Sequence, residues 1–354
     1  MEQVRVNIGE GYDVFIASGL IKECGTIMMN TIGKCKLAIV SDSNVAPLYL
    51  EAVSNSLKLC GYEVYSFVFP AGEANKNMNT LSDIIEFFAE SGLTRADCAI
   101  ALGGGVTGDM TGFAAGCYMR GIRYVQMPTT LLAAVDSSVG GKTAVDLKAG
   151  KNLAGLFIQP SLVICDTRCL GTLPPEVLAD GCAEAIKTAV LGDVTLFDIF
   201  ENKNYKRFYS KIISRCVKYK ASIVEADEKE TGLRKLLNLG HTAAHGIEKV
   251  SGYTVPHGHA VAIGTAMIAR AAESFSWCAK GLSERIVSTL EKAELPVTTE
   301  YSAHEIAQAA MMDKKRSGDK LTLVIPKDIE RCELLDIPVS ELESILSLGM
   351  GENR

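Results

Sequence analysis

Short apolar runs alternate with longer amphipathic stretches in the first half of the chain. Five runs have the length and flanking turn residues of strands: residues 36–41, 62–68, 97–102, 123–127 and 161–165. Between most of them lie stretches with helical periodicity, among them 45–60 and 78–91. Strands that alternate with helices predict an α/β domain built on a mainly parallel sheet.

From Pro174 onward the pattern changes to long helical stretches. These expected helices cover residues 175–191, 205–228, 231–250, 257–280, 283–294 and 303–312, and only 321–325 and 332–337 read as extended. We therefore expect two domains, an α/β domain over residues 1–170 and a mostly α-helical domain over residues 171–354. Because ligands of open parallel sheets bind beyond the carboxyl ends of the strands, we expect the functional site between the domains.

Composition and charge narrow the class of protein. The 354 residues are 47% hydrophobic and 22% charged, with no targeting segment at the start and no apolar run of about 18 residues. We therefore expect a cytoplasmic globular protein without a membrane partner, whose eleven cysteines are buried reduced thiols. The net charge of −6 argues against nucleic-acid binding, but a local basic cleft still allows a small anionic substrate.

A glycine-rich turn follows the third expected strand. The sequence GGGVTGD at 103–109 contains G-x-G-x-x-G, a pattern that lets a backbone approach a pyrophosphate at a helix N-terminus. A tight turn without a ligand explains the glycines equally well. Asp42, Thr129 and Thr130 follow two other strands, and these ligand-type residues at neighbouring strand ends favour a nucleotide site.

Two further segments carry charged residues that are candidates for ligand binding. Residues 136–152 are too glycine-rich for a regular element and include Lys142 and Lys151, so they form either an anion-binding loop or a solvated one. The helix expected at 181–191 is apolar all round except for Glu184 and Lys187, three residues apart. Buried charges must be paired or bind something, and an internal ion pair is the simpler alternative. For Lys220, Glu230 and Arg234, periodicity alone favours ordinary positions on a helix surface.

Four of the five histidines fall within nineteen residues. His241 and His245 are four apart on an expected helix, so their side chains point the same way and suit a shared metal. His257 and His259 face roughly opposite directions if both are helical, so only one of them joins the same site. With Glu184 as an oxygen donor, a His2Glu set suits zinc with one open position. Core or helix-capping histidines are the alternative.

These pieces together resemble one family, the 3-dehydroquinate synthases. The likeness runs in order through nearly the whole chain. It rests on PAGEANK at 70–76, GGGVTGD at 103–109, YMRG at 118–121, PTTLLAAVDSSVGGKTAVD at 128–146, GKN at 150–152, AEAIK at 183–187, DEKETGLRKLLNLGHTAAH at 227–245, HG at 257–258 and DKK at 313–315.

The resemblance implies a Rossmann-like first domain and a complete set of site residues. It implies a metal, Zn²⁺ or Co²⁺, held by Glu184, His241 and His257. It implies catalytic roles for Lys142, Asn152, Lys187, Glu230, Arg234, Asn238 and His245. Substrate contacts are implied for Arg120, Asp136, Lys151, Lys220, Lys314 and Lys315. NAD contacts are implied for Asp42, Asn44, Glu73, Lys76, Gly104, Gly105, Asp109, Thr129, Thr130, Lys142, Lys151 and Thr172.

The activity implied by the resemblance is a phosphate-eliminating cyclisation. The family's substrate, 3-deoxy-arabino-heptulosonate 7-phosphate, carries a carboxylate and a phosphate, which suits a basic site in an acidic chain. NAD oxidises it transiently, phosphate leaves by β-elimination, the hydride returns, and ring opening followed by an internal aldol step gives 3-dehydroquinate. We also expect a homodimer.

Two related activities are the alternatives. 2-Deoxy-scyllo-inosose synthase, a sister sugar-phosphate cyclase, usually has glutamate at the position of His245, so the histidine disfavours it. A metal- and NAD-dependent polyol dehydrogenase has no need for the lysines of residues 142–152. One departure from the family pattern is HGH at 257–259, where HGE is usual.

Overall fold

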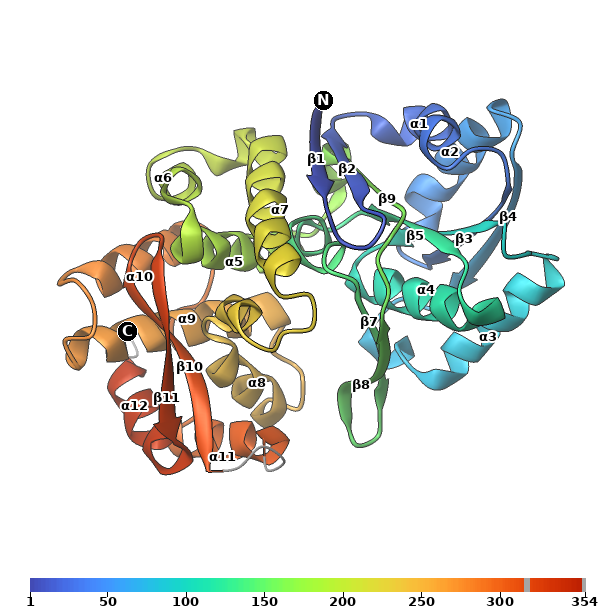
Figure 1. Ribbon diagram of the computed structural model, residues 1–354. Coiled ribbons are helices and arrows are strands. Elements are labelled where there is room, and N and C mark those ends of the chain that lie inside the picture. Colours follow the sequence, from blue (N-terminus) through green and yellow to red (C-terminus); the bar gives the residue numbers. More distant parts are fainter. Residues whose placement is uncertain (315–318, 352–354) are drawn as a thin grey trace. The chain divides into compact units, whose positions relative to one another are not determined.

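The computed structural model describes residues 1–314 and 319–351 and separates into two compact units (Figure 1). The first unit contains residues 1–173 and 220–225, and the second contains residues 174–219 and 226–354. The chain thus passes from the first unit to the second at Leu173–Pro174. In the described part of the chain no helix is long and apolar enough to cross a membrane.

A seven-stranded sheet forms the centre of the first unit, in the order β1-β2-β9-β6-β5-β3-β4. All neighbouring strands are parallel except the antiparallel pair β1 and β2. The strands are β1 (Glu2–Val6), β2 (Tyr12–Ala17), β3 (Lys36–Asp42), β4 (Glu63–Phe69), β5 (Cys98–Gly103), β6 (Arg123–Pro128) and β9 (Leu162–Asp166). The mainly parallel sheet predicted from the apolar runs is confirmed, while β1 and β2 were not among the expected strands.

Helices cover both faces of this sheet. Leu37 and Ile39 of β3 pack with α1 (Cys24–Thr31) and α2 (Ala46–Leu59) in one apolar cluster. Ala38 and Val40 pack in a second cluster with α3 (Met78–Glu90) and α4 (Gly105–Cys117). Successive side chains of a strand point to opposite faces, so a strand covered on both sides is apolar throughout. This double cover explains why the central strands read as continuous apolar runs.

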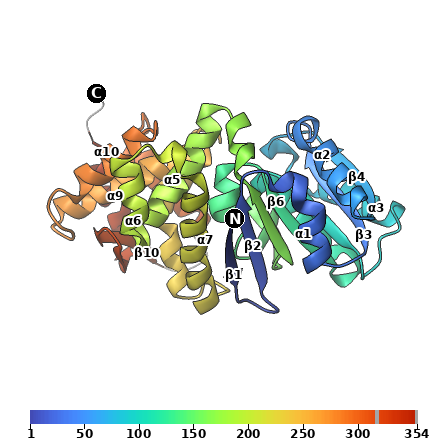
Figure 2. The same cartoon turned by 90° about the horizontal axis from the view of Figure 1, so that it is seen from above.

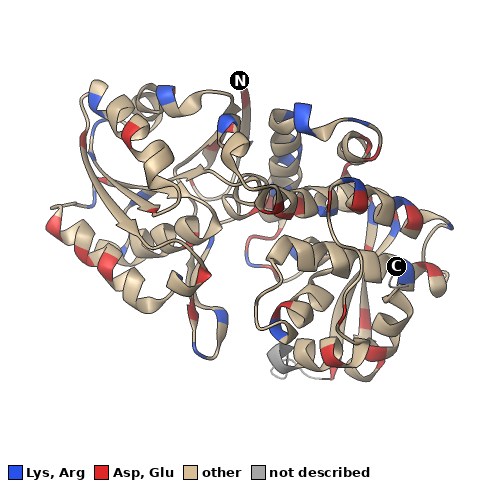
Figure 3. Ribbon diagram, turned by 180° about the vertical axis from the view of Figure 1, so that it is seen from behind, with Lys and Arg blue, Asp and Glu red and all other residues tan. Residues whose placement is uncertain are grey.

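The glycine-rich segment 136–152 folds differently from the expectation. Strands β7 (Lys142–Leu147) and β8 (Gly150–Phe157) form an antiparallel hairpin, and lysines lie along its loop (Figure 3). The prediction of an irregular loop was therefore wrong. Gly140 and Gly141, at φ +100° and +72°, turn the chain just before β7 and leave the strand itself free of glycine.

The second unit is mostly helical, with α9 (His257–Ser274) as its central helix (Figure 2). Nearly every residue of α9 after its first turn is buried, because it packs against four other helices: α5 (Pro175–Gly192), α8 (His241–Val250), α10 (Leu282–Lys292) and α12 (Leu342–Gly349). The remaining elements are α6 (Val194–Asn202), α7 (Tyr209–Ala226), α11 (Ala303–Lys314) and the hairpin of β10 (Lys320–Asp328) and β11 (Arg331–Pro338). Residues 220–225, near the end of α7, belong to the first unit.

The long helix expected over residues 231–250 is interrupted. A 3-10 helix covers Leu233–Asn238, and α8 begins only at His241. Gly240, at φ +75°, separates the two in the left-handed conformation. The break matters because it places His241 in the first turn of a new helix.

Candidate active site

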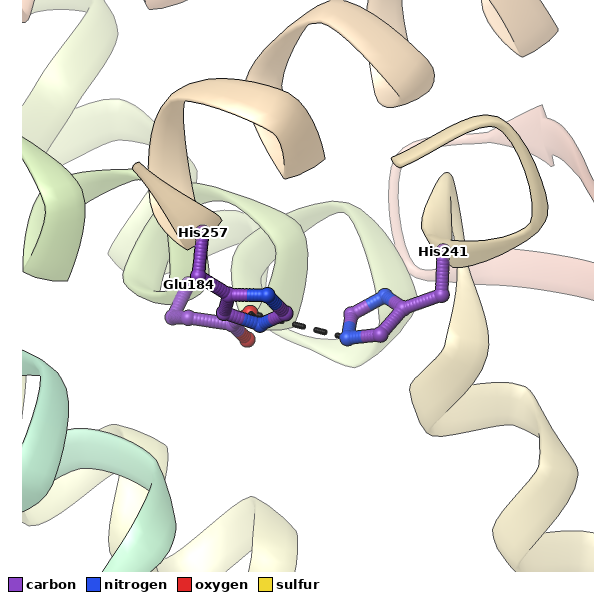
Figure 4. Close-up of side chains that lie close together, drawn as sticks. All are labelled: Glu184, His241 and His257. Atoms are coloured by element: carbon purple, nitrogen blue, oxygen red, sulfur yellow. Dashed lines mark ion pairs between the residues drawn. The ribbon is translucent and has the colours of Figure 1, made fainter. Parts of the chain in front are cut away.

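A carboxylate and two imidazoles converge in the second unit (Figure 4). Glu184 projects from α5, while His241 and His257 are the first residues of α8 and α9. One ligand atom of each lies within 4.8 Å of the other two, and the Nε2 atoms of the histidines lie 3.7 and 3.4 Å from Glu184 Oε1. Ligand atoms about 2.0–2.2 Å from a tetrahedral ion lie roughly 3.3–3.6 Å apart. The three side chains therefore fit a zinc-type site with one open position.

The carboxylate of this group is buried next to a lysine. Glu184 is 1% exposed, and Lys187 Nζ lies 2.5 Å from its Oε2. Within the described residues, neither oxygen of Glu184 accepts a hydrogen bond of good geometry. Burial opposes ionisation, but Lys187 and the two histidines hold the pKa of Glu184 well below its usual range. A buried, ionised carboxylate with unused acceptor positions is the donor that a cation needs.

Both ligand histidines are held at their second ring nitrogen. The Nδ1 of His241 lies 3.1 Å from the carbonyl oxygen of Leu239, which can only accept, so Nε2 keeps its lone pair. The Nδ1 of His257 lies 3.4 Å from Glu248 Oε2. Burial lowers the pKa of His241 well below its usual value. For His257 burial also lowers the pKa, but the adjacent carboxylates of Glu184 and Glu248 outweigh it and raise the pKa to about 10.

The other two clustered histidines lie outside the three-ligand group. The ring of His245 is centred 5.6 Å from that of His241 and 6.5 Å from that of His257. His259 instead faces α5: its Nδ1 lies 2.6 Å from Asp180 Oδ1, and its backbone N–H donates to the same oxygen at 2.9 Å. His259 thus helps to fix the start of α9, and the HGH sequence leaves His257 as the histidine that faces Glu184.

The loop before α8 orders three polar side chains. Asp227 accepts the backbone N–H of Arg234 at 3.0 Å, and Glu230, at φ +59°, accepts a hydrogen bond of 2.8 Å from Asn238 Nδ2. The guanidinium of Arg234 donates to the carbonyl of Glu228 and is only 2% exposed. The surface position that periodicity alone favoured for Arg234 is therefore wrong, because the chain is not continuously helical there.

In the first unit, the glycine turn joins β5 to the N-terminus of α4. A Cβ at Gly104 would come 3.1 Å from Thr130 Cγ2, and one at Gly105 would come 3.2 Å from Ser137 Oγ. Both contacts are tighter than ordinary packing. The small residues therefore keep the first backbone N–H groups of α4 open to an anion.

Polar side chains surround this turn at the neighbouring strand ends. Asp42 accepts the backbone N–H of Asn44 at 2.9 Å through Oδ1 and the hydroxyl of Thr107 at 3.0 Å through Oδ2. The hydroxyl of Thr129 is buried and has no hydrogen-bond partner among the residues described. An unsatisfied buried hydroxyl beside an open helix terminus suits a bound polar ligand.

A buried lysine links three segments near the same turn. Lys76 Nζ lies 2.6 Å from Asp109 Oδ2 and donates to Asn152 Oδ1 at 2.6 Å. Lys151 Nζ lies 3.7 Å from Glu73 Oε1. Burial raises the pKa of Asp109 to about 6, although Lys76 acts in the opposite direction. The structure thus gathers five residues for which the family resemblance implied cofactor-binding, substrate-binding or catalytic roles.

The buried Lys220 pairs with the half-buried Asp136 in the first unit. Lys220 Nζ donates to the backbone oxygen of Asp136 at 2.6 Å and to its Oδ1 at 2.9 Å. Lys220 is 8% exposed, so the surface position favoured by periodicity is again wrong. Its ammonium reaches back from α7 to the segment after β6.

The remaining predicted residues lie on exposed segments or outside the described part. Arg120 and Lys142 are exposed, and Thr172 shares a hydrogen bond of 2.6 Å with the hydroxyl of Tyr49. Lys314 ends α11, where only the backbone is described, and Lys315 lies outside the described residues.

Residues 66–180 match the family described as 3-dehydroquinate synthase N-terminal, and residues 181–316 match 3-dehydroquinate synthase C-terminal. The chain belongs to the 3-dehydroquinate synthase family. The 3-dehydroquinate synthase of Enterococcus faecalis is 39% identical over 342 residues, which cover 95% of this chain and 96% of that protein.

Solved structures of sugar-phosphate cyclases share the fold of this 3-dehydroquinate synthase family member. A 2-epi-5-epi-valiolone synthase from Streptomyces hygroscopicus with NAD⁺ and Zn²⁺ bound has a TM-score of 0.87 and 26% identity, with 98% of each chain covered. A 2-deoxy-scyllo-inosose synthase complexed with carbaglucose-6-phosphate, NAD⁺ and Co²⁺ has a TM-score of 0.87 and 23% identity, with 98% of this chain and 100% of that chain covered. The second likeness shows the fold alone.

Two acidic residues of this 3-dehydroquinate synthase family member were not predicted as part of the site. Glu248 contacts a ligand histidine, and Asp227 orders the loop that carries Arg234. Glu248 had a usable signal, because it lies seven residues after His241 and therefore on the same face of the helix. Asp227 had none, since its partners are backbone N–H groups of a turn.

Proposed function

We infer that the chain is a 3-dehydroquinate synthase, which converts 3-deoxy-arabino-heptulosonate 7-phosphate to 3-dehydroquinate and phosphate. The observation that carries this conclusion is the relationship to curated 3-dehydroquinate synthases, at 39% identity over nearly the whole chain. The reaction belongs to the shikimate pathway of aromatic amino acid biosynthesis. Phosphate leaves without hydrolysis, so the enzyme is a carbon-oxygen lyase.

The proposed cofactors are NAD in the first unit and a divalent metal in the second. Support for NAD comes from the open start of α4, the unsatisfied Thr129 hydroxyl and the NAD⁺ bound by the valiolone synthase. Support for the metal comes from the geometry of Glu184, His241 and His257. We propose Zn²⁺, with Co²⁺ as a substitute. When bound, NAD accepts a hydride from C5 of the substrate and later returns it, while the metal polarises substrate oxygens.

Basic and amide side chains account for recognition of the substrate. Its carboxylate and phosphate need cationic or hydrogen-bond donors, which lysine, arginine and asparagine side chains supply. We assign this role to Arg120, Lys142, Lys151, Asn152, Lys220, Arg234, Asn238 and the lysines at 314 and 315. Asp136 orients Lys220, and Glu230 orients Asn238, through the hydrogen bonds described above.

Proton transfer falls to His245 in this proposal. Its ring lies beside those of His241 and His257 but outside the three-residue group, and from this position we propose that it acts on the substrate. A ketone at C5 acidifies the proton at C6, and phosphate then leaves by β-elimination. Once the carbonyl is reduced again, the ring opens and an internal aldol step closes the carbocycle. Lys187, next to the buried Glu184, lowers the pKa of this carboxyl group and so favours its ionised form.

The two alternative activities fit the chain less well. The 2-deoxy-scyllo-inosose synthase shares the fold at only 23% identity, and the match to 3-dehydroquinate synthase is closer at the level of sequence. A polyol dehydrogenase has no use for the buried Arg234 and Lys220, which suit an anionic substrate. The homodimer and the cytoplasmic location stay predictions.

Removal of the metal tests this function. We expect protein stripped with a chelator to release no phosphate from the heptulosonate phosphate above a protein-free control, because the Lewis acid is lost. Addition of Zn²⁺ or Co²⁺ should restore release, and it should fail to do so in Glu184→Gln. Undiminished phosphate release by the stripped protein would contradict the proposal.

A further inference from the structure

His241 and His257, the two histidines of the proposed metal site, are oriented by different kinds of hydrogen-bond acceptor. A backbone carbonyl holds the Nδ1 of His241, whereas the side chain of Glu248 faces the Nδ1 of His257. In both cases Nε2 is left to face Glu184. The carbonyl is part of the main chain and cannot be lost by substitution. Glu248 is therefore the replaceable part of this arrangement.

Glu248 occupies a position where a carboxylate is costly. It is 6% exposed and lies on α8, two turns after His241. Burying a charge is unfavourable by several kcal/mol unless a partner compensates it. Its Oε2 lies 3.4 Å from His257 Nδ1 on α9, so the carboxylate connects the helix that carries one ligand to the side chain of another.

We propose that Glu248 is a positioning residue for the metal, and that its carboxylate accepts the Nδ1–H of His257 and thereby directs Nε2 toward Glu184 and His241. The inference rests on the proposed metal site and extends it by one residue. Outer carboxylates of this kind fix the tautomer and orientation of a ligand histidine, and their loss typically weakens metal binding about 10–100-fold. Helix α8 would then carry one of the three ligands, His241, and orient a second, His257, through Glu248.

A purely structural role is the competing explanation. The backbone oxygen of Glu248 accepts the N–H of Tyr253 at 2.7 Å, so this residue also shapes the turn after α8. That hydrogen bond survives any change of the side chain. If the role of Glu248 is purely structural, Glu248→Gln should lower the stability of the protein, and its effect on zinc affinity should be the same with and without His257.

The test compares zinc affinities of purified, metal-stripped proteins by competition with a chromophoric chelator. We expect Glu248→Gln to bind Zn²⁺ about 10–100-fold more weakly than the wild-type chain. The matched control is Glu273→Gln, because Glu273 is a hydrogen-bonded carboxylate at the far end of α9 that accepts the N–H of Gly281 at 2.8 Å. The control should keep wild-type affinity. Wild-type affinity in Glu248→Gln would overturn the proposal.

A second set of variants separates positioning from folding. Glu248→Asp keeps the charge but shortens the side chain by one methylene group, so it should also bind Zn²⁺ more weakly. Thermal unfolding of the same variant shows whether its stability has changed. In a His257→Ala background, Glu248→Gln should cause no further loss of affinity, because the effect passes through His257. An equal further loss there would overturn the proposal. Failure of the wild-type chain to bind Zn²⁺ would overturn the metal assignment itself, whereas tight wild-type binding with an unaffected Glu248→Gln would overturn this inference alone.

Discussion

His245 has the sequence spacing of a metal ligand but not the position of one. Its ring is centred 5.6 Å from the ring of His241, outside the group formed by Glu184, His241 and His257. Three protein ligands and an open position are what a catalytic zinc requires, and a fourth ligand would close the site to substrate. We therefore propose that His241 and His245, neighbours on one helix face, have different roles.

This division of tasks predicts different losses in two alanine variants. His241→Ala should lose bound zinc, because one of three ligands is gone. His245→Ala should keep its zinc and lose turnover by about 10²–10⁴-fold, as expected for removal of a proton-transfer group. Elemental analysis of the purified variants, combined with phosphate release, makes the comparison. Equal loss of metal in both variants would show that the pair is a shared clamp.

Which residues could be identified from the sequence depends on the kind of contact they make. The spacing of the histidines and the isolated charge of Glu184 in an apolar helix were visible, because each feature lies within one element. Glu248 and Asp180 contact histidines on another helix, and local periodicity does not reveal that α8 and α5 both pack against α9. Cross-helix partners of the clustered histidines were therefore missed.

At the scale of elements, the start of α8 depends on one glycine. Gly240 holds φ +75°, and a Cβ there would lie 2.5 Å from Thr265 Oγ1 and 2.6 Å from the Thr265 backbone nitrogen. We expect Gly240→Ala to lower the free energy of unfolding by about 2–4 kcal/mol, since left-handed strain and overpacking add. Because His241 follows directly, zinc affinity should fall as well. Urea unfolding and chelator competition measure the two effects.

Gly252 provides the matched control for this prediction. It has a similar φ of +62°, but a Cβ there meets nothing within 4 Å. Gly252→Ala should therefore cost only about 1–2 kcal/mol from left-handed strain and leave zinc affinity unchanged. Equal losses of stability and unchanged zinc affinity in both variants would contradict the prediction, because the contact of Gly240 with Thr265 would then have no effect on the site.

Elements with a strong period were predictable, and those set by turns were not. Buried strands such as β3 and β5 and the amphipathic helices α2 and α3 lie within about two residues of their predicted bounds. The hairpin of β7 and β8 was missed because the glycines of residues 136–152 lie just before β7 and at the first position of β8, and only the structure shows that they do not interrupt a strand. The break before α8 was missed because a glycine inside a helical pattern does not reveal its φ.

At the scale of the whole molecule, each unit carries one part of the proposed chemistry. The first unit holds the glycine turn and the buried Lys76 with its partners Asp109 and Asn152. The second unit holds the metal group, His245 and Arg234. The buried cations Lys76, Lys187, Lys220 and Arg234 are all candidate site residues, and we propose that they allow a chain of net charge −6 to accept an anionic substrate. The expectation that the site lies between the domains stays a prediction.

In the proposed reaction the oxidation is transient, so NAD acts as a catalyst and is not consumed. The most direct measurement supplies the heptulosonate phosphate in large excess over NAD and follows 3-dehydroquinate, phosphate and absorbance at about 340 nm, where NADH absorbs, in one reaction. If the oxidation is transient, we expect many molecules of 3-dehydroquinate for each NAD, one phosphate for each 3-dehydroquinate, and no accumulation of NADH. One NADH for each substrate molecule consumed, with turnover stopping when NAD is exhausted, would contradict it and identify a dehydrogenase.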